Sequence, residues 1–94
     1  MQNSRHQKAT GLTAATTFSF SPNLTGATVL WMHAEGTGTL TVEGKLLPEC
    51  AAWVPLGDSI NLSTAAAIVR IDAPVHAVRV TPTGTASVFF SYGT

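Results

Sequence analysis

Charged side chains are scarce in this sequence. Only 11% of its 94 residues are charged, and five basic residues balance five acidic ones, so the formal net charge at pH 7 is zero. Nucleic-acid binding depends on cationic contacts to phosphate, so we expect no nucleic-acid partner. A free monomer usually keeps about 25–35% of its surface residues charged. The low charge therefore favours a surface that partners partly cover, with a neutral surface rich in Thr and Ser as the alternative.

Cysteine is nearly absent as well, and long hydrophobic runs are missing. Cys50 is the single cysteine, which excludes an intrachain disulfide and favours a reducing compartment or an assembly without cross-links. No apolar run approaches the roughly 20 residues of a membrane-spanning helix, so we expect no membrane partner. The 45% of hydrophobic residues fit one small folded domain with a thin core. Contacts with partners are the remaining way to stabilise such a domain.

The first eleven residues differ from the rest of the chain. Residues 1–11 contain Arg5, His6 and Lys8 but no acid, and the residues behind these charges are too polar for a secretory signal. We interpret residues 1–11 as a flexible basic N-terminal arm and residues 12–94 as a single β-sandwich domain. The arm is either a disordered terminus or a segment that adds a strand to a neighbouring subunit. In the second case, deletion of the arm leaves a folded body and weakens assembly.

Short β-rich runs follow one another from residue 12 onward, separated by turn signals about every 8 to 12 residues. No segment has the pattern of a long helix, which excludes a parallel α/β fold. The sequence therefore predicts an all-β fold, a small antiparallel β-sandwich or a Greek-key or jelly-roll-like barrel of about eight strands with an extended N-terminal arm. The expected strands are 16–21, 27–34, 39–43, 50–54, 60–62, 68–72, 75–81 and 85–92. The expected turns include 21–23, 35–38, 44–45, 73–74 and 82–84.

Both faces of the second expected strand are apolar. Residues 29, 31 and 33 fall on one face and residues 30, 32 and 34 on the other, so this strand lies centrally or is covered by a partner. In the last strand, alternation places Phe90 toward the core and Phe89 on the outer face with serines. An interface or a loop is needed to cover Phe89.

No pattern for catalysis is present. The lone thiol of Cys50 and the imidazoles of His6, His33 and His76 stand in no nucleophile motif, so we expect no enzyme. His33 and Glu35 share a strand face, but two ligands at this spacing are common by chance. A symmetric oligomer is the one arrangement that gathers several copies of a histidine. We expect no metal and no cofactor.

The two tryptophans have two interpretations. Trp31 and Trp53 can stack on sugar rings, as in carbohydrate-binding modules, or lie in a core or subunit interface. Trp31 stands within an apolar strand and Trp53 beside Val54 and Pro55, which favours the core or interface. The residues predicted to form an interface are Arg5, His6, Lys8, Trp31, Trp53 and Phe89.

The C-terminal part resembles a known group of proteins. Residues 68–81, Ile-Val-Arg-Ile-Asp-Ala-Pro-Val-His-Ala-Val-Arg-Val-Thr, and residues 83–88, Thr-Gly-Thr-Ala-Ser-Val, are similar to the closing hairpin of small virion structural proteins of tailed bacteriophages. The resemblance implies a capsid decoration (cement) protein that binds and stabilises neighbouring coat subunits. A tail or head-tail connector protein is the alternative within the group.

The same resemblance implies where the protein acts and with what. Its partners are the major coat protein or other virion subunits, together with further copies of the chain in a homo-oligomer, a trimer by analogy. It is made in the host cytoplasm and resides on the capsid surface. The resemblance carries no catalytic residue, and a carbohydrate-binding β-sandwich module remains the alternative outside this group.

Overall fold

The computed structural model describes residues 5–20, 29–47, 49–71 and 75–93, with the backbone alone at Arg5, Val29 and Gly93. These residues form nine strands and no helix, which confirms the all-β prediction. The strands are β1 (Arg5–Leu12), β2 (Thr16–Ser19), β3 (Val29–Gly36), β4 (Thr39–Lys45), β5 (Val54–Pro55), β6 (Ile60–Asn61), β7 (Ala67–Ile71), β8 (Ala77–Pro82) and β9 (Ala86–Gly93).

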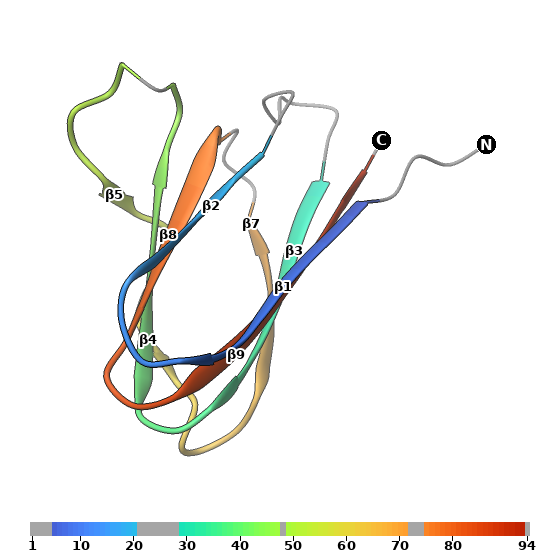
Figure 1. Cartoon of the computed structure of the whole chain (residues 1–94), viewed down its shortest axis with the longest axis vertical. Helices are drawn as coiled ribbons and strands as arrows, with labels where there is room; N and C mark the ends of the chain where they lie inside the picture. Colours follow the sequence, from blue (N-terminus) through green and yellow to red (C-terminus); the bar gives the residue numbers. More distant parts are fainter. Residues whose placement is uncertain (1–4, 21–28, 48, 72–74, 94) are drawn as a thin grey trace.

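The strands form two antiparallel sheets that pack face to face (Figure 1). The four-stranded sheet has the order β1-β9-β3-β7, and the second has the order β2-β8-β4-β5, with β6 also paired to β4. Successive strands from β1 to β4 alternate between the sheets. This interleaved order is that of a jelly roll, one of the architectures that the sequence left open.

Alternation of side chains along the strands builds the core. In β4, Leu40 and Val42 are buried between the sheets and Thr41 is exposed, as the period of two predicts. Leu30 and Met32 of β3 are buried, whereas Trp31 on the opposite face of this strand is exposed. Of the two apolar faces predicted for β3, one therefore lies in the core and the other lies on the outside of the sheet.

Aromatic rings fill the centre of the sandwich. The ring of Phe90 in β9 lies 4.8 Å from that of Phe18 and 5.5 Å from that of Phe20, between centroids. The ring of Tyr92 meets that of Phe20 edge to face at 5.0 Å. Such tilted and edge-to-face pairs are the favoured geometry of aromatic contacts. Residues on opposite sheets thus hold the two layers together.

Two short turns carry the chain between the sheets at one end of the sandwich. Residues 37–38 join β3 to β4, and residues 83–85 join β8 to β9. The amide of Thr37 donates to the carbonyl oxygen of Thr85 at 2.8 Å, and the amide of Thr83 donates to that of Thr39 at 2.9 Å. The turns come so close that a Cβ on Gly84 would lie 2.7 Å from the carbonyl oxygen of Thr37, which explains glycine there.

The expected closing hairpin of β8 and β9 is wrong. The two strands follow each other in sequence, but they belong to opposite sheets and do not pair. The apolar face of each strand explains the difference. Val78 and Val80 of β8, and Val88 and Phe90 of β9, are all buried, so the strands face each other across one core.

The expected arm is also corrected. Residues 5–12 do not stand outside the domain but form β1, which pairs antiparallel with β9 of the same chain, from Arg5 with Tyr92 to Leu12 with Ala86. Ala9 and Leu12 pack against the core, and the side-chain amide of Gln7 donates to the carbonyl oxygen of Ser19 at 2.9 Å. One interpretation of the arm had it add a strand to a neighbouring subunit. In the structure it adds that strand to β9 of its own chain.

Smaller differences concern turns and short strands. The expected strand 50–54 is limited to β5, Val54–Pro55, opposite Gly44 and Glu43 of β4. A proline lacks the amide proton for a second ladder, so β5 ends the sheet. The expected turns 21–23 and 73–74 lie outside the described residues.

Deletion of residues 1–11 tests the assignment of β1. Because the deletion removes most of a paired strand and exposes the edge of β9, we expect the free energy of unfolding to fall by roughly 2 kcal/mol or more, at about 0.5–1.5 kcal/mol net per hydrogen bond. Urea denaturation followed by circular dichroism measures the loss. Deletion of residues 1–4, which precede β1, is the matched control. Equal stability of both truncated proteins contradicts the assignment.

Candidate binding face of the four-stranded sheet

The outer face of the β1-β9-β3-β7 sheet brings together residues that are far apart in the sequence. The strand register places two rows of outward side chains across all four strands. The first row is His6, Ser91, Trp31 and Arg70. The second row is Lys8, Phe89, His33 and Ile68. Four of the six residues predicted to form an interface, His6, Lys8, Trp31 and Phe89, therefore lie on one face.

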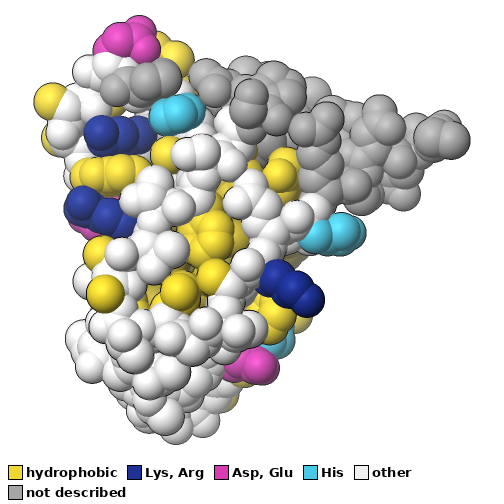
Figure 2. Space-filling model, viewed as in Figure 1, with side chains coloured by type: hydrophobic (Ala, Val, Ile, Leu, Met, Phe, Trp, Pro, Cys, Tyr) yellow, Lys and Arg dark blue, Asp and Glu magenta, His cyan; other side chains and the backbone are white. Residues whose placement is uncertain are grey.

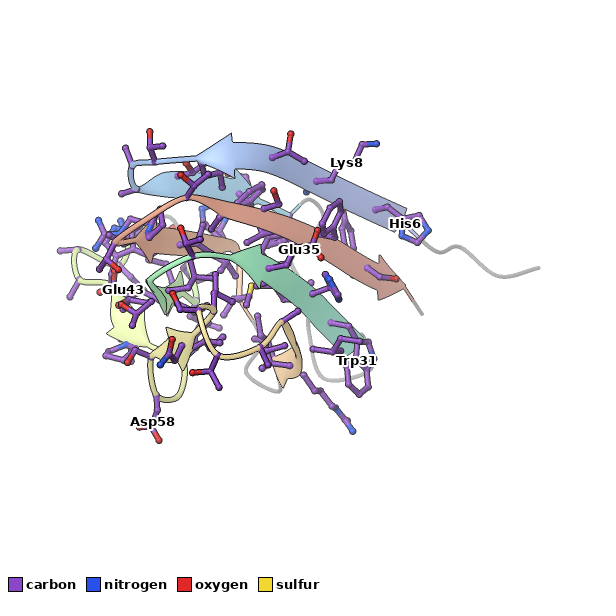
Figure 3. The ribbon with its side chains drawn as sticks, turned by 90° about the horizontal axis from the view of Figure 1, so that it is seen from below. His6, Lys8, Trp31, Glu35, Glu43 and Asp58 are labelled. Atoms are coloured by element: carbon purple, nitrogen blue, oxygen red, sulfur yellow. The ribbon has the colours of Figure 1, made fainter. Side chains whose placement is uncertain are left out.

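Apolar groups on this face are unusually open to solvent. Trp31 is 44% exposed and Ile68 is 67% exposed, while Phe89 is half-buried. A groove of about 570 Å³ runs between them. Its lining includes His6, Lys8, Trp31, His33, Ile68 and Phe89. In Figure 3, the labelled His6 and Trp31 lie toward the same end of the sheet, on different strands.

Polar contacts fix several of these side chains. Nε2 of His33 lies 3.2 Å from Oε2 of Glu35 on the same strand face, and the His33 ring meets the Phe89 ring edge to face at 5.7 Å. The guanidinium of Arg70 lies over the Trp31 ring, 5.9 Å from its centroid. A cation over an aromatic face is attracted by the ring electrons. The groove thus combines ordered aromatic surface with donors and acceptors at its rim, as a binding surface requires.

Trp53 lies on the other sheet and has a different role. Its ring is contacted by Nζ of Lys45 at 4.9 Å and by the Arg79 guanidinium at 4.7 Å, measured to the ring centroid. Nη2 of Arg79 also donates to Oε1 of Glu43 at 2.8 Å. The Trp53 ring therefore already has two cation–π partners in its own chain. The structure does not bring it to the same face as Trp31, and the side chain of Arg5, the sixth predicted residue, lies outside the described residues.

Sequence reasoning did not name Ser91, Arg70 or Ile68 as interface residues of this face, and Ile68 is the apolar residue among them. Its strand was expected, but its place beside His33 follows only from the pairing of β3 with β7. Three exposed apolar residues outside this face, Leu46 and Leu47 directly after β4 and Val54 in β5, were not predicted either. Their exposed fractions are 53%, 41% and 58%.

The described residues show no arrangement for metal binding or membrane crossing. In this part of the chain no three His, Cys, Asp or Glu side chains come together as metal ligands, and Cys50 is a free, half-buried thiol. Nor do these residues include a helix able to span a bilayer.

Two solved structures share the fold. No protein-family model matches the chain, and no curated protein matches it in sequence. A protein of Bacillus endospore appendages, which form a family of disulfide-linked pili, superposes with a TM-score of 0.59 at 14% identity over 100% of this chain and 87% of that one. A mutant family 29 carbohydrate-binding module superposes with a TM-score of 0.61 at 10% identity over 99% of this chain and 81% of that one.

Both likenesses concern the fold. At 10% and 14% identity they show a shared fold and carry no role over to this chain. Neither concerns bacteriophages, so the virion role stays a prediction. The site has to be argued from its own residues.

The two tryptophans should differ in their effect on stability. We expect Trp53→Ala to lower the free energy of unfolding by about 1–2 kcal/mol, because two cation–π contacts are lost at about 0.5–1 kcal/mol each. Trp31→Ala removes one longer contact and should cost less. Guanidinium denaturation of both variants beside the wild type measures the difference. A larger loss for Trp31→Ala contradicts the structural role given to Trp53.

Proposed function

We propose that the protein is a structural subunit of a tailed-bacteriophage virion, a capsid decoration protein that binds neighbouring coat subunits. It makes these contacts through the outer face of the β1-β9-β3-β7 sheet. The observation that carries the proposal is the open apolar surface of Trp31 and Ile68, 44% and 67% exposed, on the face that also contains Phe89. Exposed apolar surface of this kind marks an interaction site.

The charges of the molecule support a covered face. In Figure 2, which has the viewing direction of Figure 1, uncharged side chains cover most of the surface in view. On the candidate face, Lys8 and Arg70 flank the apolar residues, and Glu35 is paired with His33. This arrangement of an apolar centre with a polar rim is the usual anatomy of a protein interface. Aromatic and arginine side chains at the centre supply most of the binding energy there.

The fold is consistent with such a role. The jelly-roll order occurs in viral capsid and lectin domains. The structural neighbour from endospore appendages is a pilus protein, so a sandwich of this type can serve as a building unit. The thin core of a 94-residue chain gains stability from bound neighbours, since any partner that binds only the folded state shifts folding toward it.

Incorporation into particles tests the proposal. The wild type and Trp31→Ala are expressed during growth of the phage that carries the gene, and virions are purified on density gradients. We expect Trp31→Ala to be reduced at least tenfold in purified particles, because a central aromatic anchor is lost. Val54→Ala, which changes an exposed apolar residue on the other sheet, is the matched control and should be incorporated normally. Absence of the wild-type protein from virions contradicts the role.

Carbohydrate binding is the second candidate, and one observation favours it. The open Trp31 ring lies beside a groove whose lining includes His6, Lys8 and Ser91, so stacking and hydrogen bonding are available together. The neighbour from the carbohydrate-binding modules shares the sandwich but at 10% identity transfers no residue.

A glycan array separates this candidate from the structural role. If a glycan binds, Trp31→Ala should abolish binding, and Trp53→Phe should preserve it because the Trp53 ring is engaged by Lys45 and Arg79. Both variants are first checked for folding by circular dichroism. No binding by the wild type, or equal loss in both variants, rejects the carbohydrate site on this face.

A further inference from the structure

The edges of the two sheets differ in how well they are protected. β1 carries His6 and Lys8 and has an irregular register between Ala9 and Leu12. β2 has four residues, β6 has two, and the two-residue β5 contains Pro55. Charges, irregularities, prolines and short lengths are the usual protections of an edge strand. Among the edges that the structure describes, β7 has the least protection.

β7 combines an open edge with a favourable sequence. Its five residues, Ala67–Ile71, contain three β-branched side chains and no proline, and among the described strands β7 pairs only with β3. Arg70, the single charged residue, has its guanidinium 5.9 Å from the centroid of the Trp31 ring, on the outer face of the sheet. Ile68 is 67% exposed. An exposed, β-branched edge is a template for pairing with another strand.

The space beside β7 leads into the core. A groove of about 400 Å³ opens between β7 and the Leu56–Ile60 segment of the other sheet. Its apolar lining is Val69 and Ile71 of β7 with Val42, Leu56 and Ile60 of the other side, and Gly57, Asp58 and Arg70 complete it. The open side of the sandwich therefore exposes apolar surface together with an unpaired strand edge. A partner that adds to β7 covers both at once.

The pattern of β7 matches a second copy of itself. We propose that two copies pair antiparallel through β7, about a two-fold axis at Val69. This register pairs all five residues. It places Ile68 opposite Arg70 of the partner subunit on the outer face, and Ala67 opposite the partner's Ile71 on the inner face. A register centred on Arg70 instead sets two guanidinium groups opposite each other, which is unfavourable.

The pairing extends the proposed function, on which it rests, by supplying the contact between copies. The two four-stranded sheets become one continuous sheet in the order β1-β9-β3-β7-β7-β3-β9-β1. The exposed apolar residues of both copies then lie on one surface. A closed two-fold pair also uses the same patch on each subunit, as most homodimers do.

A charge change at position 68 tests the register. Sedimentation equilibrium across micromolar concentrations should give the wild type a mass of twice 9.8 kDa. Ile68→Lys faces the partner's Arg70 twice in the pair, so we expect the dimer to weaken roughly tenfold or more. Ile68→Glu places a carboxylate opposite each arginine and should preserve the dimer. Thr41→Lys, an exposed change on β4 of the other sheet, is the matched control.

The outcomes separate this pairing from the proposed function. Circular dichroism and thermal melts first establish that each variant is folded. Weakening by Ile68→Lys alone supports the β7 pair. A wild type that is monomeric at every concentration, or equal weakening by Ile68→Lys and Ile68→Glu, overturns it. The virion role is tested by a different measurement, the incorporation of the wild type and of Trp31→Ala into particles. A monomeric wild type in sedimentation therefore overturns the β7 pairing without deciding the virion role.

Discussion

The hydrogen bonds between the two turns at residues 37–38 and 83–85 fix how the sheets meet. Each turn passes the chain from one sheet to the other, and backbone and threonine groups of one turn bond to the other. The amide of Thr39 donates to Oγ1 of Thr83 at 2.8 Å, and the amide of Thr85 donates to Oγ1 of Thr37 at 3.2 Å. With β3, β4, β8 and β9 tied at one end, the register of both sheets and the facing of the aromatic core follow.

The candidate face is a consequence of this register. His6 and Lys8 come from the first strand, Trp31 and His33 from the third, and Phe89 from the last, yet they form two adjacent rows. None of these side chains is needed in the core, where Phe90 and the alternating aliphatic residues fill the space. The outer rows are thus free to serve recognition, whether of a coat subunit or of a glycan.

Alternation along single strands could be predicted from the sequence, because it depends only on neighbouring residues. The buried positions of β4 and β9 were obtained in this way. Pairing between distant strands could not, because many registers bury the same residues. The place of β1 beside β9, the separation of β8 from β9 and the exposure of Ile68 all depend on such pairing. The split of Trp31 and Trp53 between two sheets has the same origin.

That split gives the molecule two optical reporters in different surroundings. The indole of Trp53 is in contact with two cations on one sheet, and the indole of Trp31 is open to water beside the groove on the other. The sequence contains no further tryptophan. Fluorescence of the unmodified protein therefore carries an internal reference. A partner that covers the groove changes the emission of Trp31, and loosening of the sandwich changes that of Trp53.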